Sequence, residues 1–168
     1  MAILIALGSN RPHGQYGPPE SVLAAAVDAL EAKGIETLAR SGISRTAPLG
    51  PSHRRYANMV VEVATTMSPE ALLQTLHEIE AAFGRRRWRR WGDRVLDLDL
   101  ISYDQQVRPS RLAWPGAGEA GRVLVLPHPR MHERRFVLDP ALDVAPGWRH
   151  PVLGLTIRQM HVRLAARR

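Results

Sequence analysis

The run from Leu96 to Leu100 alternates strictly between leucine and aspartate. Successive side chains of a β-strand point to opposite faces of a sheet, so a period of two predicts a strand, which we extend over residues 95–103. Its leucines face a core. Asp97 and Asp99 project side by side from the other face. The chain therefore has to contain a sheet with at least one buried face and a polar region on the other.

The remaining hydrophobic pattern predicts the partners of this strand. Further strands are expected at residues 2–7, 35–46 and 58–65, and a short one at 123–126, with helices at 22–33 after Ser21, at 68–84 and at 155–167. The segment 108–121 is expected to be irregular. The order strand, helix, strand, strand, helix, strand is typical of the α+β, ferredoxin-like βαββαβ sandwich. No repeat or linker interrupts it, which favours a single domain over residues 1–168.

The acid pair indicates a metal site. Asp97 and Asp99 have Cα atoms roughly 7 Å apart on one strand face, and two such carboxylates without counter-charge repel each other. Mg²⁺ prefers carboxylate oxygens and fills its shell with water and substrate phosphates. The alternative is a half-exposed strand with a polar outer face.

A basic segment precedes the acids. Residues 84–94 contain six arginines and two tryptophans, the formal net charge of the chain is +7, and Lys33 is the only lysine. Arginine binds phosphate through a planar fork of donors. Acids that hold metal, flanked by arginines, are recurring parts of phosphoryl transfer. A patch that binds nucleic acid, with tryptophans stacked on bases, is the alternative.

The composition of the chain excludes sites that depend on cysteine and bears on the cellular location of the protein. Cysteine is absent, which excludes disulfides, thiolate metal sites and a cysteine nucleophile. The apolar residues 1–7 lack a basic start and are too few to cross a bilayer. We expect a cytoplasmic protein without a membrane partner.

Several motifs together resemble the 6-hydroxymethyl-7,8-dihydropterin pyrophosphokinase family. The resemblance spans residues 2 to about 146 and includes Ala6-Leu7-Gly8-Ser9-Asn10, the segment 44–51, Tyr56-x-Asn58, Glu80-x-x-x-Gly84-Arg85, the segment 90–101, Pro127-His128 and Arg134-x-Phe136-Val137-Leu138. No single motif is decisive, but the ordered set is highly specific.

The resemblance implies a role for each matched residue. Asp97 and Asp99 resemble the ligands of two Mg²⁺ ions that bridge the phosphates of ATP. Substrate-binding positions for the pterin are matched by Thr46, Ala47, Leu49, Tyr56, Asn58 and Phe136, with Tyr56 and Phe136 stacking on its ring. Catalytic or nucleotide-binding positions are matched by Arg85, Arg87, Trp91, Arg94, His77, Leu100, His128 and Arg134. Arg111 and Arg122 both remain candidates for one further contact to ATP.

The implied reaction is diphosphate transfer from ATP to 6-hydroxymethyl-7,8-dihydropterin, a step of folate synthesis, by a monomer that binds no nucleic acid. An RNA-binding domain and a diverged, non-catalytic relative are the alternatives. The predicted central strands carry no aromatic-rich motif for stacking bases, and Asp97 and Asp99 would repel a phosphate backbone. Both observations disfavour RNA binding.

Overall fold

The computed structural model describes residues 1–46, 55–84, 95–117 and 123–167. Its elements follow one another as β1 (Ile3–Ser9), α1 (Pro19–Ala32), β2 (Glu36–Arg40), β3 (Ser44–Thr46), β4 (Tyr56–Ala64), α2 (Pro69–Ala82), β5 (Asp97–Tyr103), α3 (Trp114–Ala117), η2 (Met131–Glu133), α4 (Arg135–Val144) and α5 (Ile157–Ala166). The predicted alternation of strands and helices up to β5 is confirmed. The fold is α+β.

The strands form one antiparallel sheet in the order β2-β4-β1-β5, and β3 pairs with β4 beyond the end of β2. The central strand β1 pairs along its whole length with β4 and with β5 on its other side. In this described part of the chain, β5 is hydrogen-bonded to a neighbouring strand on one side only.

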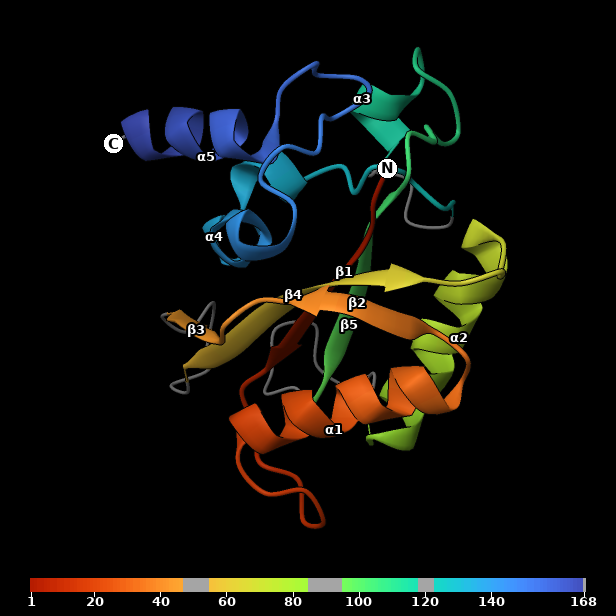
Figure 1. Ribbon diagram of the computed structural model, residues 1–168, viewed down its shortest axis with the longest axis vertical. Coiled ribbons are helices and arrows are strands. Elements are labelled where there is room, and N and C mark those ends of the chain that lie inside the picture. Colours follow the sequence, from red (N-terminus) through yellow and green to blue (C-terminus); the bar gives the residue numbers. More distant parts are fainter. Residues whose placement is uncertain (47–54, 85–94, 118–122, 168) are drawn as a thin grey trace.

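The sheet lies between two layers of helices (Figure 1). Its first face carries Ile5, Leu7, Val61 and Leu98 and packs against α1 and α2, forming one hydrophobic cluster. Its second face is apolar only in part. There Leu4, Val60 and Ile101 pack against α4, and α5 packs on α4 rather than on the sheet. Burial of both faces stabilises the sheet.

Local sequence explains how the two helices on the first face begin. At α2 the expected signals are present: Ser68 accepts a hydrogen bond from the Ala71 amide at 3.2 Å, and Pro69 occupies the first turn. Helix α1 begins earlier than predicted, because Pro18 rather than Ser21 is its N-cap and Pro19 opens it. Proline fits a first helical turn, whose amide has no helical partner.

The predicted strand over 35–46 is two strands. Between β2 and β3, the Ser41 hydroxyl accepts a hydrogen bond from the Val60 amide at 3.0 Å and donates to the Gly42 carbonyl at 2.7 Å. A side chain thus replaces a backbone group of the sheet ladder, and the strand ends there. This local competition explains the break.

The C-terminal third differs most from the sequence prediction. Residues 123–126 form no strand, and only Leu126 makes an isolated bridge, to Arg108. Helix α3 lies inside the segment expected to be irregular, and helix α4 was not predicted. The terminal helix α5 is confirmed with shorter bounds, and Thr156 with Gln159 forms its capping box.

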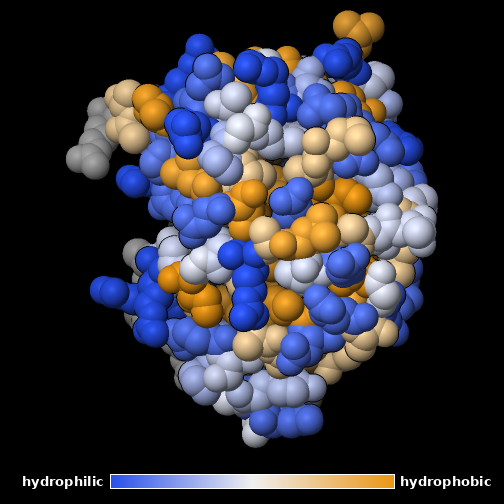
Figure 2. Space-filling view, in the orientation of Figure 1, coloured by the Kyte–Doolittle hydropathy of each residue, from blue (hydrophilic) through white to orange (hydrophobic). Residues whose placement is uncertain are grey.

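Apolar residues also gather across the middle of the face shown in Figure 2, ringed by hydrophilic ones. Leu38 on β2 and Ile43 in the turn after it are among the exposed large apolar residues.

Within the described residues, no helix is long and apolar enough to cross a membrane.

Candidate active site

Polar groups collect at the end of the second face that α4 leaves uncovered. The register places Gly8 of β1 opposite Asn58 of β4 on one side and opposite Asp97 of β5 on the other. Asp99 lies opposite Ala6. The intervening Leu98 is buried in the first cluster, so the predicted division of β5 into an acidic and an apolar face is confirmed.

Helix α4 brings a positive charge to the acids. Its Val137, Leu138 and Ala141 are buried in the cluster on the second face, and the start of the helix lies near Asp99, in the first half of β5. Arg134, the N-cap residue, lies with its Nη1 4.0 Å from Asp99 Oδ2. Burial lowers the pKa of Arg134, while Asp99 acts in the opposite direction. The guanidinium remains charged, because arginine does not deprotonate in proteins.

The same guanidinium joins the acids to an aromatic ring. Arg134 Cζ lies 5.5 Å from the centroid of the Phe136 ring, within the range of a cation–π contact. Asp99, Arg134 and Phe136 therefore form a continuous chain of contacts from β5 to the first turn of α4. A ligand with an anionic part and a flat ring can therefore pair its anion with Arg134 and stack its ring on Phe136.

His128 is fixed next to β5. Its amide donates to the Ile101 carbonyl at 2.8 Å, and its Nδ1 accepts from the Arg130 amide at 3.2 Å. Burial lowers the pKa of His128; Asp99 opposes this effect, whereas Arg134 and Arg130 add to it. The ring is therefore neutral at pH 7 with its proton on Nε2, where it is a hydrogen-bond donor.

Asn58 is oriented by its neighbours on β3 and β4. It is 4% exposed, and its Nδ2 donates to Thr46 Oγ1 at 3.0 Å and more weakly to the Tyr56 carbonyl at 3.4 Å. With the amide group committed as donor, Oδ1 is the end that faces Gly8, where an added Cβ would lie 3.4 Å away. The Tyr56 ring borders the same point at 3.8 Å.

Two predicted nucleotide contacts lie away from this face. Leu100 is 4% exposed and belongs to the hydrophobic cluster on the opposite face. His77 is exposed on α2, which packs against β5. A ligand that reached both of them as well as Asp99 would have to pass around the outer edge of β5.

Other predicted residues lie outside the described parts of the chain. They are Ala47, Leu49, Arg85, Arg87, Trp91 and Arg94, and the candidate Arg122 is outside them as well. Its competitor Arg111 donates a hydrogen bond through Nη1 to the Pro151 carbonyl. That bond attaches Arg111 to the C-terminal segment.

Sequence reasoning assigned no role to two residues that shape this region. Gly8 forms its floor between Asn58 and Asp97, and Glu80 of α2 accepts a hydrogen bond from the Leu98 amide at the outer edge of β5. Signals for both are present in the sequence. A Gly-Ser-Asn triplet directly follows the apolar run 1–7, and an acid occupies a helix position next to the apolar Leu76 and Ile79.

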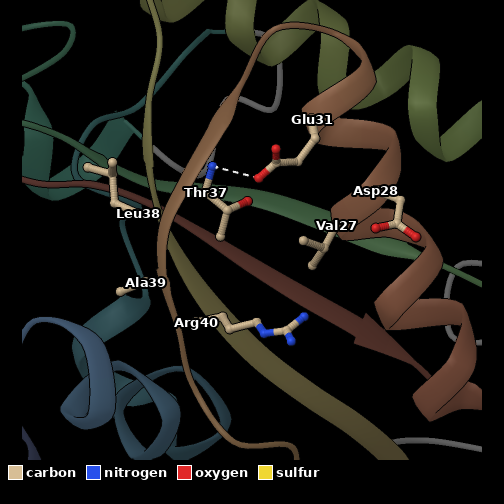
Figure 3. Close-up of a pocket in the computed structure, with 7 residues that line it drawn as sticks. All are labelled: Val27, Asp28, Glu31, Thr37, Leu38, Ala39 and Arg40. Carbon is tan, nitrogen blue, oxygen red and sulfur yellow. Dashed lines mark hydrogen bonds between the residues drawn. The ribbon is translucent and has the colours of Figure 1, made fainter.

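A cavity of about 490 Å³ lies elsewhere, between α1 and β2 (Figure 3). Its charged lining consists of Asp28, Glu31 and Arg40, and Glu31 accepts a hydrogen bond from the Thr37 amide at 3.0 Å. Strand β2 is at the opposite edge of the sheet from β5. With two carboxylates to one guanidinium, this cavity does not suit an anion, and we place the candidate site at the Asp97–Asp99 end.

Comparison with known proteins identifies the family of the chain. A family model described as 7,8-dihydro-6-hydroxymethylpterin-pyrophosphokinase (HPPK) matches residues 4–146. The chain is 40% identical over 149 residues to a 2-amino-4-hydroxy-6-hydroxymethyldihydropteridine pyrophosphokinase of Synechocystis, covering 88% of this chain and 70% of the relative. It is 38% identical over 162 residues to the enzyme of that name from Methylorubrum extorquens, covering 95% and 91%.

Solved structures with a similar fold include proteins named for the same family. The HPPK-DHPS protein of Plasmodium falciparum superposes with a TM-score of 0.69 at 13% identity, over 99% of this chain and 45% of the longer one. At that identity the likeness concerns the fold alone. The sequence matches, which extend over most of the chain and of its relatives, show that this chain belongs to the 7,8-dihydro-6-hydroxymethylpterin pyrophosphokinase family.

Proposed function

We propose that the chain is an ATP-dependent diphosphotransferase. It converts ATP and 6-hydroxymethyl-7,8-dihydropterin into AMP and the pterin diphosphate, a step of folate biosynthesis. The observation that carries this proposal is the family match over residues 4–146, together with relatives whose names state this activity. The hydroxyl oxygen of the pterin bonds to the β-phosphorus of ATP and its proton is released to water, the bond from that phosphorus to the oxygen shared with the α-phosphorus breaks, and AMP leaves with that oxygen.

The donor set at Asp97 and Asp99 fits Mg²⁺ that arrives with a nucleotide. In the described residues, no three His, Cys, Asp or Glu side chains cluster as a metal site. A pair of carboxylates suits Mg²⁺, which completes its shell with phosphate oxygens and water. We propose two such ions, held by Asp97 and Asp99; bound there, they would supply positive charge to the polyphosphate.

Arg134 and His128 serve the phosphate side of the site. The Arg134–Asp99 separation of 4.0 Å leaves the guanidinium free to turn toward a phosphate, which accepts a bidentate pair of hydrogen bonds. Neutral His128 donates through Nε2 without adding charge. Through the family resemblance we also assign Arg85, Arg87 and Arg94 to the phosphates and Trp91 to catalysis. In such chemistry, positioning and electrostatic stabilisation supply most of the catalysis.

The pterin is proposed to bind over Gly8. Asn58 Oδ1 faces this point as an acceptor for a ring N–H, because Thr46 and the Tyr56 carbonyl already hold the amide donors. Tyr56 and Phe136 offer their rings for stacking on the flat heterocycle. Thr46, Ala47 and Leu49 complete the pterin side, and His77 and Leu100 border the nucleotide at the outer edge of β5.

Three proposals concern the chain as a whole. Residues 1–168 act as one pterin pyrophosphokinase domain, whose sheet order β2-β4-β1-β5 supports a ferredoxin-like core. The domain acts as a monomer in the cytoplasm, where ATP is available. Its ligands are the nucleotide and the pterin rather than a nucleic acid.

The direct test is product analysis on purified protein. We expect AMP and the pterin diphosphate to form in equal amounts when Mg²⁺, ATP and the pterin are all present, and neither to form when the pterin is omitted. Release of ADP in place of AMP, or no pterin diphosphate in the complete mixture, would contradict the proposal.

A further inference from the structure

Strand β5 carries Asp97 and Asp99 at an edge of the described sheet, where it pairs with β1 alone. The outward amides of an edge strand have no neighbouring strand to bond to, and a buried amide needs a partner. For Leu98, the residue between the two acids, that partner is a side chain. Its amide donates to Glu80 Oε1 of α2 at 3.2 Å.

Glu80 occupies a position at which packing alone favours an apolar residue. It is 2% exposed and stands among Leu72, Leu76 and Ile79 on the buried side of α2. Removing a carboxylate from water is expensive unless hydrogen bonds compensate, so an acid here is not explained by packing. The contact with Leu98 gives it a specific structural task.

The hydrogen bond from Leu98 to Glu80 affects the direction in which the side chains of Asp97 and Asp99 project. The pairs Asp97 with Gly8 and Asp99 with Ala6 hold β5 from the inner side. The bond from Glu80 holds the peptide between Asp97 and Leu98 from the outer side. A strand fixed on both sides keeps its pleat, and the pleat determines that the two carboxylates project together from the second face.

We propose that Glu80 is a positioning residue for diphosphate transfer, which acts through the Leu98 amide to aim Asp97 and Asp99. The inference rests on the proposed function for its consequence in catalysis. The contact itself does not depend on that function. Glu80 touches neither substrate in this account. A residue of this kind affects turnover more than the affinity for the pterin.

The experiment compares Glu80→Leu, which keeps an apolar side chain of similar size, with Glu80→Gln, which keeps an oxygen acceptor. Glu78→Gln on the exposed side of the same helix is the matched control. Amide exchange at Leu98 is measured by NMR without nucleotide or metal. Turnover, KM for the pterin and the Mg²⁺ concentration for half-maximal rate are measured on the same samples, with circular dichroism to check the fold.

For Glu80→Leu we expect exchange at Leu98 to accelerate about tenfold, as for loss of one hydrogen bond. We also expect turnover to fall at least about tenfold, with a higher Mg²⁺ requirement and a KM for the pterin within about twofold. Glu80→Gln and Glu78→Gln retain Leu98 protection and most of the activity.

Glu80→Leu with unchanged turnover overturns the inference, whether or not Leu98 exchanges faster. If Glu80→Leu does not fold, Glu80→Gln decides, because loss of its activity while Leu98 stays protected also overturns the inference. Failure of the wild type to form AMP overturns the proposed function instead, and the exchange at Leu98 still reports the contact.

Discussion

Replacing Gly8 by alanine tests the geometry of the pterin side. Gly8 lies between Asn58 and Asp97, and its backbone is not among the positive-φ glycines. Alanine can therefore adopt the same backbone. The added Cβ would meet Asn58 Oδ1 at 3.4 Å and the Tyr56 ring at 3.8 Å, which are contacts rather than clashes.

These distances predict opposite effects on stability and on binding. A compatible Gly→Ala change stabilises a protein by about 0.4–1 kcal/mol, because it restricts the unfolded chain. A methyl group added to a close-packed contact costs about 1–3 kcal/mol. If the pterin rests on Gly8 in the same way, its affinity falls about fivefold to a hundredfold. The effect on ATP affinity should be smaller.

The assay is calorimetric titration of the pterin and, separately, of a non-hydrolysable ATP analogue with Mg²⁺, beside urea unfolding. Gly147→Ala is the control, since nothing lies within 4 Å of its added Cβ. We expect wild-type binding for the control. Wild-type pterin affinity in a folded Gly8→Ala variant would refute the placement of the ring over Gly8.

Other changes address the acids, the stacking residues and a buried histidine. Asp97→Ala and Asp99→Ala should each abolish most Mg²⁺-dependent AMP release with an unchanged circular dichroism spectrum; near-wild-type activity in either would count against the metal assignment. Tyr56→Ala and Phe136→Ala should weaken pterin binding by several-fold to about tenfold, and ATP binding less, in separate titrations. Loss of ATP affinity with unchanged pterin affinity would contradict the stacking of these two rings on the pterin. Burial lowers the pKa of His150 from 6.5 to about 4. Below pH 6.5, His150 is therefore protonated in the unfolded chain while it stays neutral in the folded chain. The free energy of unfolding falls by up to about 3 kcal/mol by pH 4. Urea unfolding at pH 7 and pH 4.5 should show this loss of stability in the wild type and a smaller loss in His150→Asn. Equal losses in the two proteins would show that His150 is not its cause.

Short-range patterns were sufficient for the order of strands and helices up to β5, because period and capping chemistry are local. The break at Ser41 was missed, since it depends on a hydrogen bond to Val60, nineteen residues away. Helix α4 was missed as well. It contains Pro140, and its four buried residues are covered by tertiary packing of α4 against the sheet and against α5. Tertiary contacts, rather than propensity, determine where such elements form.

In the candidate site, too, some features follow from local sequence pattern and others from tertiary packing. Alternation alone placed Asp97 and Asp99 on one face of a strand, and that placement holds in the structure. The approach of Arg134 to Asp99 follows from the packing of α4 and is invisible to any periodicity. The resemblance to a family implied only that both residues belong to the ATP side of the site.

The central claim is that the group transferred is a diphosphate and that its acceptor is the pterin. ATP labelled with ³²P at either the β- or the γ-phosphorus tests this directly, after separation of the pterin product from nucleotides. Our account predicts that both labels enter the pterin product with equal yield while unlabelled AMP accumulates. Label from the γ-position alone, or no label in the pterin from either position, would contradict it.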